Sequence, residues 1–187
     1  MYQRESYQDV LALIGRWKIV SKKQKKVILI GNFSVGKTSL IRRFVENSFS
    51  DEYISTIGMK ISKKEININD EILMLLIWDI EGAVDKVKRV NKTYMRGANG
   101  VIIVADITSN DIKDDIISHL NDFYSVNKDT VPAIIAINKI DKNMDFRIDI
   151  SDIIARYPMI LDKFYTSAKD SLNVEPMFEL LSKEMIK

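Results

Sequence analysis

Residues Val27 to Ser39 read VILIGNFSVGKTS, an apolar run followed by a loop that two glycines punctuate. Gly31 and Gly36 bracket four residues and precede Lys37 and Thr38, which gives the spacing G-x-x-x-x-G-K-T. Between a strand and a helix, this spacing is typical of a loop whose backbone N–H groups hold phosphate oxygens. We expect Lys37 to reach the outer phosphates and the Thr38 hydroxyl to bind Mg²⁺. The alternative is an ordinary glycine turn before a helix.

The composition narrows the class of protein. The chain has 187 residues, 46% of them hydrophobic and 29% charged, which predicts one globular domain. A net charge of +2 gives no bulk electrostatic reason to expect nucleic-acid binding. The absence of cysteine excludes disulfides and thiolate ligands in this sequence. Because no apolar run reaches the length of a membrane span and the N-terminus is polar, we expect a cytoplasmic protein, with peripheral association with a membrane as the alternative. We also expect it to be a monomer.

Residues 1–25 differ in composition from the rest of the chain and are predicted to form an extension. Apolar residues recur there at helical spacing: Tyr7, Val10, Leu11, Ile14 and Trp17. A basic segment from Arg16 to Lys26 contains no acidic residue. The pattern is typical of an amphipathic helix that ends in a basic hinge. Such a helix could dock on an anionic membrane, fold back on the domain, or bind a partner, and the sequence leaves all three open.

From residue 26 onward, strands and helices alternate. The patterns predict strands at residues 26–30, 59–68, 71–78, 100–105, 133–137 and 160–165. They predict helices at residues 37–47, 85–95, 111–126, 150–156 and 174–186. Asn69 and Asp70 indicate a turn, so the second and third strands should form an antiparallel hairpin. The remaining alternation predicts a mostly parallel sheet, covered on both faces, that binds ligands at the carboxyl ends of its strands.

Two further motifs concern the phosphates and a metal ion. Asp79 to Gly82 reads D-I-E-G directly after the third strand. Asp79 is suited to hold Mg²⁺ through water, and the Gly82 N–H can approach a terminal phosphate. Thr56 lies in the loop after the first helix, where its hydroxyl is expected to complete the Mg²⁺ shell when a γ-phosphate is present.

Another pair of motifs concerns the base. Asn138 to Asp141 reads N-K-I-D after the fifth strand, and an aspartate there can accept two parallel hydrogen bonds from guanine. Ser167 to Lys169 reads S-A-K after the sixth strand, where a backbone N–H can meet the guanine oxygen and reject the adenine amine. Alone, N-K-I-D would be interpreted as an ordinary turn, and the S-A-K match is short. Their order after successive strands favours a guanine site.

Taken together, these residues make the chain similar to a small GTPase of the Ras superfamily, and most similar to the Rab branch. The Rab-like character comes from Ser55 to Gly58, Ile77 to Asp79, and Tyr94 to Gly100 leading into Val101 to Asp106. The resemblance covers about residues 26–187. It implies an α/β fold of the P-loop NTPase class: a small G domain with a six-stranded, mostly parallel sheet, one antiparallel strand and about five flanking helices.

The resemblance also implies ligands and partners. It implies Mg²⁺ with GTP or GDP, bound by Gly31, Ser34, Val35, Gly36, Lys37, Thr38, Ser39, Phe49, Tyr53, Thr56, Gly82, Asn138, Lys139, Asp141, Ser167, Ala168 and Lys169, with Asp79 holding the metal through water. Phe49 would pack on the guanine, and Lys139 would lie along the base and ribose. Effector proteins would read switch segments around residues 49–61 and 79–96, and an exchange factor or activator would reset the switch. Trp78 would belong to the effector surface, although core packing explains a Trp at a strand end equally well.

The chain departs from the family at the positions that control hydrolysis. Ala83 stands where the family has the glutamine that orients the attacking water, and bulky Phe33 stands where it has a small residue. We therefore expect slow hydrolysis and a long-lived GTP form. Glu81, in place of the usual alanine, is a candidate to orient the water, with a solvated switch residue as the alternative. The sequence also lacks the C-terminal cysteines that carry the Rab lipid anchor.

The sequence leaves three functions open. The first is a guanine-nucleotide-dependent switch with slow turnover, and the second is a pseudo-GTPase scaffold that binds nucleotide without significant turnover. The third is an ATP-using enzyme with the same phosphate loop, which Asp141 and Ala168 disfavour. His119, the single histidine, is interpreted as a surface residue without a role.

Overall fold

The computed structural model describes residues 23–50, 56, 58–68, 71–80 and 92–187, and strands and helices alternate along these segments. The strands are β1 (Lys23–Ile30), β2 (Met59–Ile68), β3 (Glu71–Ile80), β4 (Gly100–Asp106), β5 (Ala133–Asn138) and β6 (Ile160–Thr166). The helices are α2 (Lys37–Glu46), α3 (Lys92–Met95), α4 (Ile112–Tyr124), α5 (Ser151–Arg156) and α6 (Val174–Met185), with a 3₁₀ turn η1 (Ile140–Lys142).

The six strands form one sheet in the order β2-β3-β1-β4-β5-β6. Every neighbouring pair is parallel except β2 and β3, which run antiparallel with Ile68 opposite Glu71. The predicted fold class, with its single antiparallel strand and five helices, is confirmed. Residues 69 and 70, the predicted turn of the hairpin, lie outside the described residues.

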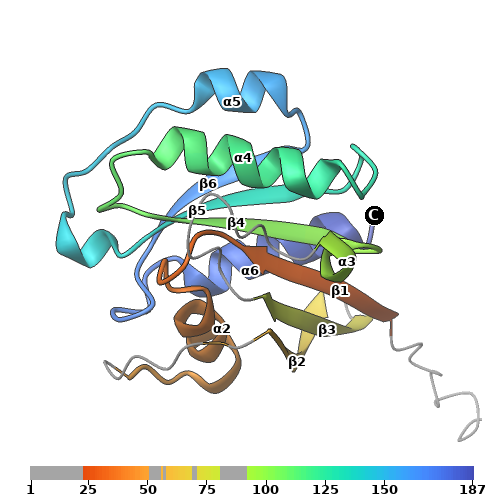
Figure 1. The fold of residues 1–187 in the computed structure, drawn as a ribbon. Helices are drawn as coiled ribbons and strands as arrows, with labels where there is room; N and C mark the ends of the chain where they lie inside the picture. Colours follow the sequence, from red (N-terminus) through yellow and green to blue (C-terminus); the bar gives the residue numbers. More distant parts are fainter. Residues whose placement is uncertain (1–22, 51–55, 57, 69–70, 81–91) are drawn as a thin grey trace, which may run out of the picture.

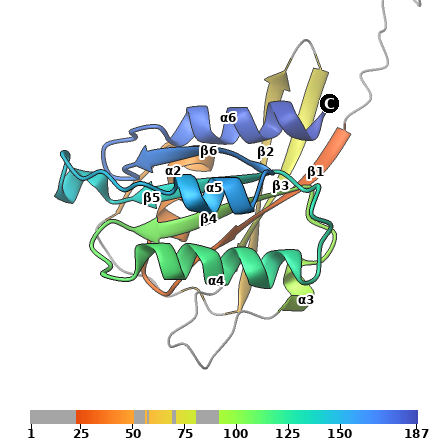
Figure 2. The same cartoon turned by 90° about the horizontal axis from the view of Figure 1, so that it is seen from above.

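The helices cover the two faces of the sheet in separate layers (Figures 1 and 2). On one face α4 and α5 pack over the β4–β6 half, with Ile116, Leu120 and Ile153 in the core. On the other face α2 and α6 pack together through Phe44 and Phe178, whose rings stack with centroids 3.9 Å apart. Because central strand β4 lies under helices on both sides, its residues Gly100 to Ala105 are buried, as a continuous apolar run predicts.

Strand β1 begins at Lys23, three residues before the predicted start at Lys26. The polar side chains of residues 23–25 are the reason that the sequence pattern assigns them to the basic extension. In the structure Lys23 pairs with Leu73 on the parallel strand β3, so backbone pairing, which does not depend on side-chain polarity, lengthens the strand. The rest of the predicted extension, residues 1–22, lies outside the described residues.

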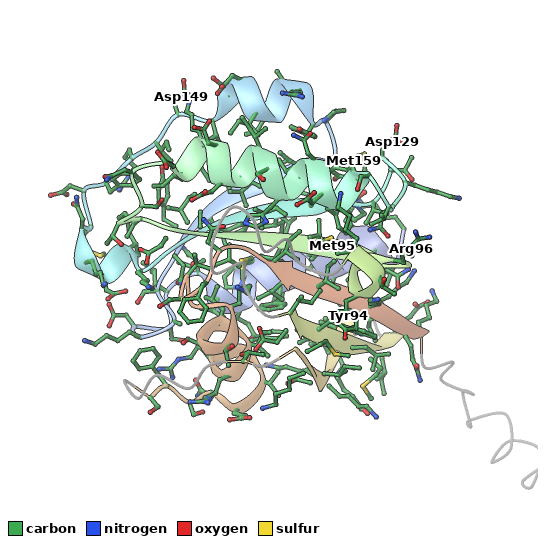
Figure 3. All side chains as sticks on the ribbon, viewed as in Figure 1. Tyr94, Met95, Arg96, Asp129, Asp149 and Met159 are labelled. Carbon is green, nitrogen blue, oxygen red and sulfur yellow. The ribbon has the colours of Figure 1, made fainter. Side chains whose placement is uncertain are left out.

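The predicted helix at residues 85–95 is described only over its last turn, as α3, since residues 81–91 lie outside the described part. Lys26 links α3 to the sheet: its Nζ donates hydrogen bonds of 2.8 Å to the carbonyls of Tyr94 and Arg96. Figure 3 labels these two residues beside β1. No helix among the described residues is long and apolar enough to cross a membrane.

Candidate functional site

A cavity of about 360 Å³ opens at the carboxyl edge of the sheet, where the loops after β1, β5 and β6 meet. Most of the predicted nucleotide-binding residues line it: Ser34, Gly36, Lys37, Thr38, Ser39, Phe49, Thr56, Asn138, Lys139, Asp141, Ala168 and Lys169. Arg42, Ser50, Ile80 and Lys142 also line it, although the sequence motifs did not single them out. The fold therefore brings together motifs that lie more than a hundred residues apart in the chain.

The loop from Gly31 to Gly36 requires glycine at both ends. A Cβ on Gly31 would lie 2.2 Å from the Val104 carbonyl oxygen, and one on Gly36 would lie 2.3 Å from the Asn138 side chain. Gly36 also has a φ of 97°, a left-handed conformation that side chains disfavour. The two glycines therefore let the loop lie directly against β4 and the end of β5.

Lys37, the first residue of α2, is buried, with 6% of its surface exposed. Its Nζ donates hydrogen bonds of 2.9 Å to the carbonyl oxygens of Gly31 and Asn32. The ammonium group is thus folded over its own loop and held at the positive end of the α2 dipole. A buried cation at a helix N-terminus makes this loop a strong binding site for an anion.

Three oxygen-bearing side chains meet beside the loop. The Thr38 hydroxyl donates a hydrogen bond of 2.6 Å to Asp79 Oδ2, and the Thr56 hydroxyl lies 2.8 Å from that of Thr38. Asp79 is 2% exposed, and burial raises the pKa of its carboxyl group above the usual range. Its Oδ1 is also buried and has no hydrogen-bond partner among the described residues. An unpartnered carboxylate oxygen beside two hydroxyls fits a hard cation such as Mg²⁺.

The motif after β5 fastens this loop to the phosphate loop. Asn138 is buried, and its Nδ2 donates a hydrogen bond of 2.9 Å to the Val35 carbonyl. Lys139 reaches the Ser34 carbonyl and forms an ion pair of 2.6 Å with Asp106. Burial acts to raise the pKa of Asp106, but hydrogen bonds from Lys139 and Thr108 hold it below the usual range. Asn138 and Lys139 thus position the loop as well as line the cavity.

Asp141 and the segment after β6 also line the cavity. The Ser167 hydroxyl donates a hydrogen bond of 2.7 Å to Asp141 Oδ1, which fixes the carboxylate. Ala168 is buried beside it. From α2, Arg43 donates to the carbonyls of Ala168 and Lys169 at 2.8 and 3.0 Å and holds this loop against the domain. A fixed carboxylate next to a backbone loop is suited to read the edge of a planar base.

Comparisons with known proteins agree with this geometry. The family model described as the Ras family matches residues 26–187. The chain is 32% identical to the GTP-binding protein yptV2 of Volvox carteri over 86% of this chain and 75% of that protein. It is 34% identical to the GTP-binding protein YPTM1 of Zea mays, over 84% of this chain and 76% of that protein. It is also 34% identical to the Ras-related protein Rab-13 of Bos taurus, over 86% and 79%.

The chain is a Rab-like member of the Ras family. The family fold explains the position of the site, because the loops that line the cavity converge where the parallel strands end. Four of the predicted nucleotide-binding and hydrolysis residues lie outside the described part: Tyr53, Glu81, Gly82 and Ala83. Gly31, Val35 and Ser167 do not line the cavity but support the residues that do, through the contacts given above.

Phe33, the bulky residue of this Rab-like phosphate loop, lines the cavity and is 39% exposed. Its side chain is therefore exposed beside the site and belongs to neither core cluster. Trp78 is half-buried and packs against the core under α4, and Lys26 Nζ lies 3.8 Å from the centre of its ring. Core packing therefore explains at least part of the role of Trp78, and its place in an effector surface stays a prediction.

The interpretation of His119 as a surface residue is wrong. His119 lies on α4 with 5% of its surface exposed, and its Nε2 is 2.9 Å from Asn32 Oδ1 in the phosphate loop. Burial, followed by the charge of Lys37, lowers the pKa of His119 to about 4. A signal was available in the sequence, because His119 falls between the apolar positions Ile116, Leu120 and Phe123 of α4.

Proposed function

We propose that this chain is a guanine-nucleotide-dependent switch that binds Mg²⁺ with GTP or GDP and turns GTP over slowly. By analogy with its Rab and Ypt relatives, it would act in membrane trafficking or signalling. The observation that carries the proposal is a single cavity that both Lys37 and Asp141 line. A cationic cradle and a carboxylate that reads the base are the two features that a guanine nucleotide requires.

At the phosphate end, Lys37 and the backbone N–H groups of residues 34–39 would hold the β- and γ-phosphates. Lys37 already lies over the loop through its bonds to Gly31 and Asn32, so it needs little reorganisation to meet a phosphate. The N-terminus of α2 adds its dipole. These groups would contact only the phosphates, so the affinity that they contribute does not depend on the base.

Mg²⁺ would be held by the hydroxyls of Thr38 and Thr56, with Asp79 acting through water. In the observed arrangement Asp79 accepts hydrogen bonds of 2.6 and 3.3 Å from these two hydroxyls. When bound, Mg²⁺ supplies positive charge that neutralises the phosphate oxygens. Of these residues, Thr56 lies on the segment between α2 and β2. Its hydroxyl would bind Mg²⁺ only when the γ-phosphate is present, so the position of this segment would depend on the bound nucleotide.

At the base end, Asp141 would accept two hydrogen bonds from the N1–H and the exocyclic amine of guanine. Adenine does not present two donors in that arrangement. The Ala168 N–H would donate to the guanine oxygen, where adenine carries an amine that cannot accept. Phe49 would pack on the ring, with Lys139 along the base and ribose.

Slow turnover follows from the residues at two positions. A methyl group at Ala83 cannot orient a water by hydrogen bonding, and the exposed Phe33 ring, which lines the cavity, would obstruct both a water and an arginine finger supplied in trans. Such a finger contributes about 10³ to 10⁵ in rate where it is used. The same two residues keep open a second function, a scaffold that binds guanine nucleotide without significant turnover.

Partners would bind the segments around residues 49–61 and 79–96, as effectors do in the family, with an exchange factor or activator to reset the switch. Their described parts border the cavity through Phe49, Thr56 and Ile80. A ligand at Thr56 would therefore change the surface that a partner contacts.

Two linked measurements test the proposal. The nucleotide that copurifies with the chain is extracted and identified, and GTP, GDP and ATP then compete for the emptied site in the presence of Mg²⁺. We expect GTP or GDP in the extract. ATP should compete at least about 10²-fold more weakly, because adenine cannot make the two hydrogen bonds that guanine donates to the charged Asp141 carboxylate. Equal competition by ATP would refute the guanine assignment.

A further inference from the structure

Strand β3 carries an apolar stripe that the core does not use. Successive residues of a strand point to opposite faces, and one set, Leu73, Leu75 and Ile77, is fully buried under α2 and α6. The other set is only half-buried, and we call three of its members, Ile72, Met74 and Leu76, the β3 stripe. Among the described residues, these three belong to neither core cluster and are not packed against either one.

Polar residues on the neighbouring strands border the stripe on both sides. On β2, the residues opposite it are Asn67, Glu65 and Lys63, all exposed. On β1, Gln24 lies opposite Met74 and Lys26 lies opposite Leu76. The stripe is therefore an apolar strip between polar margins, which is the form that a docking surface takes.

Among the described residues, the contacts given on this face of β3 lie at the Leu76 end of the stripe and none lies at the Ile72 end, which we call the open end. At the Leu76 end, Lys26 Nζ lies over the Trp78 ring and donates to the carbonyls of Tyr94 in α3 and Arg96 after it. Among the described helices, Figure 1 shows α4 and α5 over the β4–β6 half of the sheet and the short α3 beside β1. At the Ile72 end the neighbouring residue on β1 is Lys23, which pairs with Leu73. The chain from residue 22 toward the N-terminus therefore starts beside the open end.

The sequence that precedes Lys23 has a matching pattern. Its apolar positions, Tyr7, Val10, Leu11, Ile14 and Trp17, fall on one side of a helix. As a helix, residues 7–17 would be about 15 Å long, and the stripe from Ile72 to Leu76 is about 13 Å long. The six residue steps from Trp17 to Lys23 can span about 20 Å, enough to bring the helix back over β3.

We propose that residues 7–17 dock as a helix on the β3 stripe of their own chain, with Leu11 and Ile14 against Met74 and Leu76. A tethered segment has an effective concentration in the millimolar range, which favours it over a second copy of the chain or a free partner at ordinary concentrations. Docking would bury the apolar faces of both the segment and the sheet. This inference does not depend on the nucleotide or on the proposed function.

The chain has no cysteine, so one introduced cysteine gives a unique attachment site for a spin label. The experiment places a nitroxide on the full chain carrying Gln8→Cys and records the methyl signals of its methionines. We expect a several-fold loss of Met74 intensity relative to Met144, which is 56% exposed and lies in the loop after η1. Leu11→Glu with Ile14→Glu should restore Met74, whereas Ala12→Glu, on the opposite side of the helix, should not. These variants leave the sheet unchanged.

Equal intensities for Met74 and Met144 in the labelled chain would overturn the proposal. A second sample mixes spin-labelled chain without isotope and isotope-labelled chain without nitroxide, and broadening of Met74 there would overturn it in favour of a second copy. Unbroadened Met74 together with flotation of the chain on phosphatidylserine vesicles would overturn it in favour of a membrane.

Discussion

His119 on α4 donates a hydrogen bond from Nε2 to Asn32 Oδ1 in the phosphate loop, across 2.9 Å. Because that oxygen can only accept, Nε2 carries the proton and Nδ1 is left unprotonated. Nδ1 is buried without a hydrogen-bond partner among the described residues. The contact holds the first half of the phosphate loop against the helix layer, and burial favours the neutral form of the ring.

This relationship predicts how stability depends on pH. Burial and Lys37 lower the pKa of His119 from 6.5 to about 4, so the unfolded chain binds more protons than the folded chain between these values. The stabilising contribution is therefore complete above about pH 6.5 and is lost as the pH falls toward 4. The loss should reach at most about 3 kcal/mol, measured by urea unfolding at a series of pH values.

His119→Gln provides the control, because Gln keeps a donor for Asn32 and does not titrate. Asp79 contributes with the opposite sign, since its raised pKa favours the folded chain at low pH. Asp79 is present in both proteins, so its contribution cancels when the unfolding free energy of His119→Gln is subtracted from that of the wild type at each pH. An identical pH dependence in the two proteins would show that His119 is not the titrating group.

A second prediction concerns the metal ion. Asp79→Asn removes the charge but keeps the shape, and it should lower the Mg²⁺ affinity of the nucleotide complex by about 10- to 100-fold. The readout is the release rate of a fluorescent GDP analogue as a function of free Mg²⁺. Asp114→Asn, on the exposed face of α4, should behave as the wild type. Unchanged Mg²⁺ dependence in Asp79→Asn would remove this residue from the metal site.

Base selectivity gives a third prediction. Asp141→Ala should reduce the preference for GTP over ATP by about 10- to 100-fold, because it removes hydrogen bonds to a charged acceptor. Competition binding with both nucleotides measures the ratio. Asp145→Ala, in the same loop but exposed, is the matched control. A ratio that stays at the wild-type value in Asp141→Ala would mean that the base is read elsewhere.

A fourth prediction concerns a double variant that should hydrolyse GTP faster than the wild type. The double variant Ala83→Gln and Phe33→Ala introduces a side chain that can orient a water and removes the Phe33 ring from the cavity lining. We expect the single-turnover rate to rise by roughly 10²-fold, the effect that positioning a reactant carries. Nucleotide affinity, measured in parallel, should change little. If the double variant hydrolyses no faster than the wild type, these two positions do not limit the reaction.

Much of the fold could be predicted because hydrophobic periodicity and the phosphate-loop spacing are local signals. The continuous apolar run of β4 and the hairpin of β2 and β3 are examples. The start of β1 could not be predicted, since the pairing of Lys23 with Leu73 depends on a strand fifty residues away in sequence. The convergence of Thr38 with Asp79 could be expected from motif order, but the Ser167 bond that fixes Asp141 could not, because nothing local specifies side-chain partners.

The burial of His119 escaped prediction for a related reason. A lone polar residue on a helix is usually solvated, and its burial here depends on a partner, Asn32, that lies 87 residues earlier in the chain. Single-sequence patterns do not report such a pairing. The apolar residues around it on α4 were the only local indication that it faces the core.

The proposal of a switch that retains GTP is tested most directly by single-turnover hydrolysis. The wild-type chain is loaded with GTP and Mg²⁺, free nucleotide is removed, and the bound nucleotide is separated and quantified over time. We predict guanine nucleotide retained in the site and a rate constant well below the roughly 4 × 10⁻⁴ s⁻¹ of unassisted Ras, which has the glutamine. A rate constant equal to or above that value would contradict slow turnover and the roles given to Phe33 and Ala83.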